Sequence, residues 1–271
     1  MKIMRYAALF LVWASVASAA LVEHTETYTD GTTEMRGYIV YDDAFEGLRP
    51  GVMVVHEWWG QNENARHRAR MLAEQGYLAL AVDMYGEGKV VEEPTTARDL
   101  AMGVLSNMQV CVSRLRAARA LLDSQTQVDP SRVAVVGYCF GGTAALGLAR
   151  AGEDVDVVAS FHGSLGTKMP PREGSVAARV LVYQGSEDAV APQAEILAFE
   201  KEMKKAQVNY KIVIYPGAKH AFSVPESDRY AEEFNLPVAY DANADQASWE
   251  DLLAELKAAF SPAVEVVAPT E

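Results

Sequence analysis

Short runs rich in Val, Ile, Leu and Tyr alternate with longer amphipathic stretches along most of the chain. Short apolar runs are typical of buried strands, and apolar residues at steps of three and four are typical of helices that pack on one side. Strands are expected at residues 37–41, 51–56, 77–82, 133–136, 155–161, 180–183 and 210–215. Because helical stretches separate these strands, the pattern predicts an α/β fold with a mostly parallel sheet and helices on both faces.

The longest amphipathic stretch predicts one helix over residues 95–123. Its apolar positions lie on a single stripe, and they are Leu100, Val104, Met108, Cys111, Leu115, Ala118 and Leu122. A stripe of this kind faces the core, so Cys111 is expected to be a small buried hydrophobe. A last helix is expected over residues 245–260, with its packing side formed by Trp249, Leu252, Leu253, Leu256 and Phe260.

The N-terminus has a pattern of its own. Lys2 and Arg5 precede an apolar run over residues 7–16, and small residues follow at 17–19. This order is typical of a secretory signal peptide, and the run is shorter than the roughly 20 residues that a membrane helix needs. We therefore expect residues 1–19 to be removed and the protein to be periplasmic or secreted, without insertion into the membrane.

The composition favours one globular domain with a full core. Half of the 271 residues are hydrophobic and 23% are charged, which is ordinary for a folded domain. The domain is expected to span residues 20–262, followed by a tail over residues 263–271. The formal net charge of −13 argues against nucleic acid and anionic membranes as partners. A small molecule is the expected partner, and the protein is expected to be a monomer or a small homo-oligomer.

The segment over residues 132–142 carries the strongest chemical signal. A buried strand runs into a Gly-x-Cys-x-Gly sequence centred on Cys139 and then into a helix. This pattern predicts a nucleophile elbow with sulfur in place of oxygen, because the two glycines leave room for a strained turn. The turn would lift the Cys139 side chain above the sheet at a helix N-terminus, where the helix dipole favours a thiolate. A disulfide with the other cysteine, Cys111, is not favoured.

An acid and a histidine should follow such a nucleophile on later strands. Asp188 comes just after one expected strand, and His220 comes after the next. In this arrangement His220 exchanges a proton with Cys139, while Asp188 holds the imidazole and stabilises its cation. Glu187 is an alternative acid, although Asp188 has the shorter and more easily fixed side chain. Asp83 also ends a strand, but it precedes Cys139 and is expected to be structural.

A second informative segment runs from His56 to Gly60, where a strand breaks into a loop beside the expected oxyanion hole. The backbone N–H groups of Phe140 and Trp58 are the expected donors to an oxyanion. Glu57 is unusual beside two tryptophans, because a partly buried carboxylate needs a partner. Alternatively, Glu57 caps the helix that follows. No cofactor is expected, and no metal is expected because the chain has no spaced set of His, Cys and carboxylate residues.

Together these motifs resemble the dienelactone hydrolase family, whose members combine a Gly-x-Cys-x-Gly elbow, a Glu-Trp-Trp-Gly or similar segment and a downstream Asp–His pair. The likeness covers residues 34–260. It implies the α/β-hydrolase fold and the cleavage of a small ester or lactone through a covalent acyl-enzyme. It also implies that Glu57 binds the resting Cys139 thiol and helps to convert it to a thiolate when substrate arrives.

The resemblance is incomplete where the substrate is chosen. Similar dienelactone hydrolases hold the substrate carboxylate with two arginines, and the matching positions here are Glu87 and Val224. An acid facing a carboxylate repels it, so a substrate other than dienelactone is expected, with Lys168 and Arg172 as candidate replacements for the arginines. An apolar pocket is also expected, with walls drawn from Trp58, Trp59, Tyr85, Tyr138, Phe140 and Phe222.

Other functions share parts of this pattern. An acyltransferase or a peptidase-like enzyme would keep the chemistry and change the acceptor. A non-catalytic exported binding protein would keep only the fold, and a redox sensor would use only Cys139. Because neither of these last two roles needs Asp188 and His220, the sequence favours a hydrolase. Whether residues 224–241 form a lid is left open by the pattern.

Overall fold

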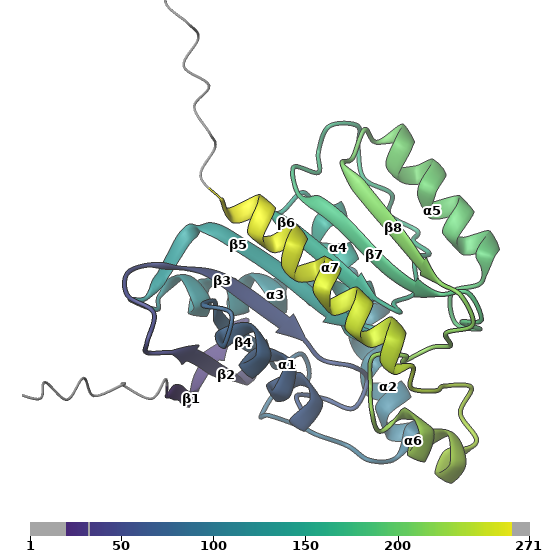
Figure 1. Cartoon of the computed structure of the whole chain (residues 1–271), viewed down its shortest axis with the longest axis horizontal. Coiled ribbons are helices and arrows are strands. Elements are labelled where there is room, and N and C mark those ends of the chain that lie inside the picture. The colour runs from purple at the N-terminus through teal and green to yellow at the C-terminus, as the bar shows by residue number, and fades with distance from the viewer. Residues whose placement is uncertain (1–19, 32, 262–271) are drawn as a thin grey trace, which may run out of the picture.

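The computed structural model describes residues 20–31 and 33–261, which form one sheet flanked by helices (Figure 1). The strands are β1 (Leu21–Thr29), β2 (Glu34–Asp42), β3 (Arg49–Val55), β4 (Leu78–Val82), β5 (Val128–Tyr138), β6 (Val157–Phe161), β7 (Arg179–Gly185) and β8 (Tyr210–Tyr215). The helices are α1 (Glu63–Ala73), α2 (Pro94–Leu105), α3 (Met108–Asp123), α4 (Phe140–Arg150), α5 (Gln193–Lys205), α6 (Ser227–Phe234) and α7 (Ala242–Phe260). The expected signal peptide and C-terminal tail lie outside the described residues.

The eight strands follow the order β1-β2-β4-β3-β5-β6-β7-β8 across the sheet. β1 pairs antiparallel with β2, and β2 pairs antiparallel with β4. All remaining neighbours are parallel. The mostly parallel sheet expected from the alternating pattern is therefore confirmed.

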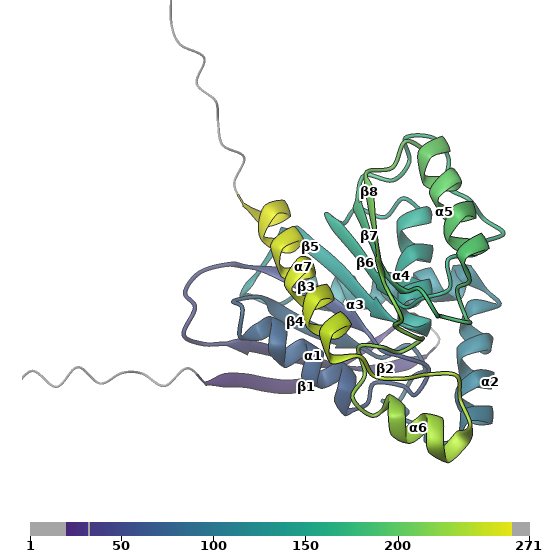
Figure 2. The same cartoon turned by 45° about the vertical axis from the view of Figure 1, so that its right-hand side comes forward.

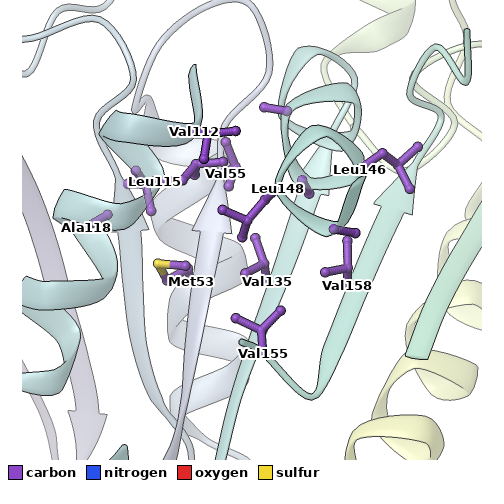
Figure 3. Packing of buried hydrophobic residues seen from close by; sticks show 14 of the residues in the cluster. Met53, Val55, Val112, Leu115, Ala118, Val135, Leu146, Leu148, Val155 and Val158 are labelled. Atoms are coloured by element: carbon purple, nitrogen blue, oxygen red, sulfur yellow. The ribbon is translucent and has the colours of Figure 1, made fainter. Parts of the chain in front are cut away.

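Two apolar layers hold the helices to the sheet (Figures 1 and 2). On one face, side chains of α3, α4 and α5 pack against β3, β5, β6 and β7, and on the other face α1 and α7 cover the sheet. Figure 3 shows part of the first layer, where Leu115 of α3 and Leu148 of α4 lie over Met53, Val135 and Val158 of the strands. Both faces are covered, as near-continuous apolar strands require.

The sequence pattern was wrong at two places. It predicted no strand over residues 21–29, where β1 forms the exposed edge of the sheet with half-buried and exposed positions in alternation. It also predicted one helix over residues 95–123, whereas the structure has α2 and α3 with a break between them. The Asn107 side chain accepts from the N–H groups of Gln109 and Val110 and so caps a new helix.

The apolar stripe continues across the break between α2 and α3. Cys111 and Leu115 are fully buried on it, and burial raises the pKa of the Cys111 thiol to about 12. Cys111 is therefore the small buried hydrophobe that the spacing predicted, and both cysteines are free thiols. The last helix, α7, begins earlier than expected because Asp241 caps it. None of the helices in the described part of the chain is long and apolar enough to cross a membrane.

The carboxyl ends of the parallel strands meet at one edge of the sheet. Glu57 follows β3, Cys139 follows β5, Asp188 follows β7 and His220 follows β8. Both views show α6 beyond this edge, beside the start of α2 (Figures 1 and 2). Loops at the carboxyl ends of strands are where ligands bind in open α/β sheets, so the fold brings the predicted site residues to the usual place.

The passage from β5 to α4 leaves no room for side chains at its two glycines. A Cβ on Gly137 would lie 2.0 Å from the Gly141 carbonyl oxygen, and a Cβ on Gly141 would lie 2.2 Å from the carbonyl oxygen of Val55. These neighbours are backbone atoms, which cannot swing aside as a flexible side chain can. Only glycine lets α4 approach β3 and the elbow this closely.

Gly141→Ala is expected to destabilise the protein by about 3 kcal/mol or more, because the new methyl group meets backbone oxygen. Gly103→Ala is the matched control, since Gly103 also lies in a helix and a Cβ there meets nothing within 4 Å. It should stabilise the protein by about 0.5–1 kcal/mol. Urea unfolding of both variants measures the difference, and equal stabilities would contradict the close packing of α4.

Candidate active site

Cys139 occupies the sharp turn between β5 and α4. Its φ of 52° lies in the left-handed region, which residues with a side chain rarely adopt. The turn is held by a hydrogen bond of 2.9 Å from the Cys139 N–H to the Phe161 carbonyl. The side chain is half-buried, and α4 begins at the next residue, Phe140. The structure therefore presents a cysteine at the positive end of a helix, as the elbow pattern predicted.

His220 lies between Cys139 and Asp188. Its Nε2 is 3.1 Å from the Cys139 sulfur, and its Nδ1 is 3.0 Å from Asp188 Oδ2. Asp188 is buried, and its Oδ1 accepts from the N–H groups of Val190 at 2.7 Å and Ala191 at 3.2 Å. The alternative acid, Glu187, is exposed. The three residues predicted from chain order thus lie in a row, with His220 in contact with both Cys139 and Asp188.

The neighbours of His220 favour the charged form of its imidazole. Burial lowers its pKa, but the Cys139 thiolate and the Asp188 carboxylate outweigh burial and raise the pKa to about 10. The folded pKa lies above the unfolded value of about 6.5. The stabilisation that His220 contributes is therefore fully present below about pH 6.5 and is lost as pH rises toward 10.

Gln184, at the end of β7, is a site residue that the sequence pattern did not single out. It is fully buried, and its Nε2 donates to Asp188 Oδ2 over 2.8 Å. The same oxygen faces Nδ1 of His220, so the amide fixes the carboxylate that orients the imidazole. The sequence signal that could have identified Gln184 is a polar residue at the end of an apolar strand, four positions before Asp188.

His162 follows β6 and packs behind the histidine of the site. Its ring meets the His220 ring edge to face with centroids 5.2 Å apart, and its Nε2 lies 2.8 Å from Ser223 Oγ. Burial and the positive charge of His220 hold the pKa of His162 well below its usual value. The neutral His162 ring therefore packs against the His220 ring. The structure gives His162 a packing role.

Three contacts fix the loop that follows β3. The His56 Nδ1–H donates to the Glu57 carbonyl, and His56 Nε2 accepts from the Met84 N–H at 3.2 Å. The Tyr85 hydroxyl donates to the Trp58 carbonyl over 2.9 Å. Burial lowers the pKa of His56 to about 4, so this ring stays neutral and keeps both bonds. The loop that carries the expected Trp58 oxyanion donor is thus rigid.

Asp83 has the structural role that its position suggested. It is fully buried, and its carboxylate accepts from the N–H groups of Arg36, Tyr85, Gly86 and Gly88 at 2.7–3.1 Å. Four donors on one carboxylate hold the turn after β4 in place. That turn contains Tyr85, whose hydroxyl group donates to the Trp58 carbonyl, so Asp83 also helps to position the loop that contains Trp58.

Glu57 is buried on the wall of the site. Burial raises the pKa of its carboxyl group to about 7, and its Oε2 has no hydrogen-bond partner within residues 20–31 and 33–261. Glu57 and Cys139 line the same cavity. A carboxyl group that titrates near neutral pH beside the nucleophile can exchange a proton under physiological conditions.

A cavity of about 210 Å³ lies over Cys139 and His220. It is mostly apolar, and its walls are formed by Glu57, Trp58, Trp59, Cys139, Val190, His220, Ala221, Ser227, Tyr230, Leu236, Pro237 and Val238. Tyr230 and residues 236–238 come from α6 and the segment after it, which the sequence pattern could not place. The wall carries no lysine or arginine.

Several expected wall residues lie elsewhere. Trp58 and Trp59 do line the cavity. Tyr138 and Phe222 are buried in the apolar layer beneath it, where Tyr138 stacks on Phe161. Tyr85 and Phe140 belong to the other layer, because both rings pack against the imidazole of His56. The prediction that Tyr85, Tyr138, Phe140 and Phe222 form the pocket wall was therefore wrong.

The residues at the two arginine positions of similar dienelactone hydrolases, and the two basic residues proposed as replacements, lie away from the cavity. Glu87 is exposed and Val224 is buried, and neither reaches the cavity wall. Lys168 and Arg172 are exposed on the loop after β6 and do not reach it either. No group of three or more His, Cys, Asp or Glu side chains within the described ranges is arranged to hold a metal ion.

A mostly parallel sheet with a cysteine elbow at its carboxyl edge, followed by an acid and a histidine, defines the class of α/β-hydrolases. The family model of the dienelactone hydrolases matches residues 35–260. The chain therefore belongs to the dienelactone hydrolase family, and with it to the hydrolases of carboxylic esters and lactones.

Relatives agree with this assignment. A putative carboxymethylenebutenolidase from Synechocystis sp. is 30% identical over 220 residues, covering 76% of this chain and 89% of the relative. The solved structure named m3DLH is 34% identical with a TM-score of 0.85, covering 89% of this chain and all of that one. A dienelactone hydrolase-like promiscuous phosphotriesterase from metagenomic libraries is 31% identical with a TM-score of 0.83, covering 90% of this chain and all of that one.

Titration of the histidine rings by NMR should separate His220 from the two neutral rings. His220 is expected to stay protonated up to about pH 10, whereas His56 stays neutral down to about pH 4. Cys139→Ala removes the thiolate and should lower the pKa of His220, while leaving His56 unchanged. An unchanged His220 titration in Cys139→Ala would contradict the charge pairing between sulfur and imidazole.

Gln184→Leu is expected to lower kcat for an ester substrate by roughly 10- to 100-fold. The Asp188 carboxylate loses a hydrogen bond of the charged kind, worth about 1.5–3 kcal/mol. KM should change little, because Gln184 does not line the cavity. Gln246→Leu on the exposed side of α7 is the control, and a kcat equal to that of this control would exclude a positioning role for Gln184.

Proposed function

We propose that the protein hydrolyses small, uncharged carboxylic esters or lactones through a covalent acyl-enzyme on Cys139. The observation that carries this proposal is the pair of contacts of the His220 ring, 3.1 Å to the Cys139 sulfur and 3.0 Å to Asp188. These are the contacts that an activated nucleophile needs, since the base reaches the sulfur and a third group orients the base.

In the first half-reaction the Cys139 thiolate attacks the carbonyl carbon of the substrate. The negative charge that develops on the carbonyl oxygen is held by the N–H groups of Trp58 and Phe140. The C–O bond to the alcohol then breaks, and the leaving oxygen takes the proton from the His220 imidazolium. The products of this step are an acyl-thioester on Cys139, a neutral His220 and the free alcohol.

In the second half-reaction water replaces the acyl group. Neutral His220 removes a proton from the water as it attacks the thioester carbonyl, and the same two N–H groups hold the oxyanion. Collapse of this intermediate releases the carboxylic acid and returns Cys139 as a thiolate beside the His220 imidazolium. A lactone follows the same steps, except that the alcohol and the acid leave as one molecule.

Glu57 guards the resting nucleophile in this scheme. Its buried carboxyl group has a pKa of about 7 and faces the same cavity as Cys139. Between turnovers the returned thiolate can take up a proton and rest as a thiol beside Glu57, which accepts that proton when the next substrate fills the cavity. Family likeness supports this role, and the oxygen of Glu57 that lacks a hydrogen-bond partner among the described residues is the atom available for it.

The shape and charge of the cavity argue for small neutral substrates. Its volume of about 210 Å³ is below the roughly 300–1,000 Å³ of sites for drug-sized ligands. Glu57 is its one ionisable carboxyl group, and the wall carries no lysine or arginine that would pair with a substrate carboxylate. A substrate that brings a carboxylate would lose its hydration without gaining a partner.

A neutral phosphotriester is a second candidate substrate. The related promiscuous phosphotriesterase has a TM-score of 0.83 to this chain, and a triester carries no charge that the cation-free wall would leave unpaired. The Trp58 and Phe140 N–H groups can hold a phosphoryl oxygen as they hold a carbonyl oxygen. This activity would use the same Cys139, so it extends the proposed function.

We also propose that the enzyme works outside the cytoplasm. Lys2, Arg5, the apolar run over residues 7–16 and the small residues at 17–19 support export. Periplasmic and secreted thiols face oxidants, so the proposed pairing of the resting Cys139 thiol with Glu57 would gain importance there. The mass of the protein recovered from a periplasmic fraction tests cleavage after residue 19.

The decisive experiment compares hydrolysis of p-nitrophenyl butyrate and a neutral lactone by wild type, Cys139→Ala and Cys139→Ser. We expect Cys139→Ala to lower kcat/KM by about 10³-fold or more, since a covalent mechanism fails without its nucleophile. Cys111→Ala is the matched control and should stay active, because Cys111 lies in the core. A p-nitrophenyl ester with a carboxylate on its acyl chain should be a poorer substrate than the neutral one.

Turnover that survives in Cys139→Ala would exclude the covalent mechanism. No turnover by the wild type, with Cys139 shown to be reduced, would exclude hydrolysis of these substrates and favour a binding role or another acyl acceptor. Diethyl p-nitrophenyl phosphate in the same assay tests the phosphotriester activity with the same variants.

A further inference from the structure

A second cavity adjoins the one over Cys139. It measures about 340 Å³ and lies between the start of α1, the segment before α2 and helix α6. Trp59 and Tyr230 line both cavities. The two side chains are therefore a shared wall, with the nucleophile on one side and an empty space on the other.

The wall is built from stacked rings. The Trp59 and Tyr230 ring centroids are 4.8 Å apart, and Phe234 lies behind them at 6.2 Å from Trp59 and 6.4 Å from Tyr230. The Arg229 guanidinium covers the Tyr230 ring at 4.7 Å. Contacts of this kind hold an aromatic ring in one orientation, so the wall is a fixed partition.

The two halves of the wall are anchored differently. Trp59 belongs to the rigid loop after β3, where the Val91 N–H donates to its carbonyl over 2.9 Å. Gly60, the next residue, has no room for a Cβ, which would lie 2.1 Å from the Lys89 carbonyl oxygen. Tyr230 lies in the middle of α6, and its half-buried ring contributes no hydrogen bond to the loop that carries Trp59. Removing this ring would open the wall without disturbing the backbone of the site.

The direction of the wall relative to the reaction follows from His220. The leaving oxygen must lie near His220 to receive its proton, so the alcohol side of the substrate lies toward Val190 and Val238. Val190 follows Asp188 and is exposed, and Val238 is bridged to His220 through the backbone. The remaining walls of the cavity, which include Trp59 and Tyr230, are then left for the acyl side.

We propose that Tyr230 sets the length limit for the acyl chain by closing the Cys139 cavity off from the second cavity. This inference rests on the proposed function, because it assigns the acyl part of the substrate to one side of that site. Tyr230 is a specificity-determining residue in this account, and it takes no part in proton transfer. The second cavity, whose lining includes five glutamates as well as Phe234, is the space that this wall closes off.

The test measures kcat/KM for p-nitrophenyl esters from acetate to dodecanoate with wild type and Tyr230→Ala. The wild type should favour short acyl chains. Tyr230→Ala should raise the ratio of octanoate to acetate activity by roughly fourfold, because each methylene that becomes buried against Trp59 contributes a factor of about four, whereas the glutamates of the second cavity do not stabilise a longer apolar chain. Two controls leave the ring stack in place. Tyr230→Phe should keep the wild-type profile, and so should Glu92→Gln, which changes a residue that lines only the second cavity and lies outside the ring stack.

A second readout does not depend on turnover. N-ethyl and N-octyl iodoacetamide alkylate the Cys139 thiolate, forming a C–S bond with release of iodide, and mass spectrometry gives the rate for each. Tyr230→Ala should speed the octyl reagent relative to the ethyl reagent by a similar factor, with Tyr230→Phe unchanged. Tyr230→Leu serves if the alanine variant unfolds, and it should give a smaller shift in the same direction.

The outcomes separate the two proposals. Unchanged chain-length ratios in both assays, in a folded Tyr230 variant, would overturn the role of Tyr230 and leave the hydrolase intact. A wild type without esterase activity would overturn the proposed function. In that case a shift in the alkylation ratio would still establish that Tyr230 closes the cavity. An unchanged alkylation ratio would overturn the role of Tyr230 together with the proposed function.

Discussion

The contact of α4 with the backbone of β3 is the constraint on which the site depends. Gly141 leaves no space for a side chain beside the Val55 and His56 carbonyls, and the chain can reach that contact only through the left-handed turn at Cys139. One close approach thus places the sulfur above the sheet and the first N–H of α4 beside it. Backbone strain at Cys139 is maintained because the buried layers on both faces of the sheet hold α4 and β5 in register.

A set of compensated charges completes the site. Asp188 is buried, but Gln184, two backbone N–H groups and His220 satisfy its carboxylate. His220 is charged because that carboxylate and the thiolate outweigh its burial. Burial raises the pKa of Glu57, and the positive charge of His220 only partly offsets that effect. Each ionisable group is therefore tuned by its neighbours, and changing one shifts the others.

Helix α6 shows how a polar segment can shape an apolar cavity. Half of the residues of α6 are exposed, and only Ser227 is buried. Its position beyond the sheet edge (Figure 2) brings Tyr230 against Trp59 and carries residues 236–238 over the site. In the role proposed for Tyr230, substrate size is controlled by an element outside the strands that precede Cys139, Asp188 and His220, which would allow specificity to change while the chemistry stays the same.

The sequence by itself determined the α/β class, the elbow at Cys139 and the order of Asp188 and His220, because strand periodicity, glycine spacing and chain order are local properties. Only the tertiary structure decided which side chains share space. Gln184 and His162 join the site because β6 and β7 lie beside β5, and Tyr138 and Phe222 fall below the cavity because of the faces on which they lie. Apolar patterning reports that a residue is buried, but the partners it meets depend on how distant strands and helices pack together.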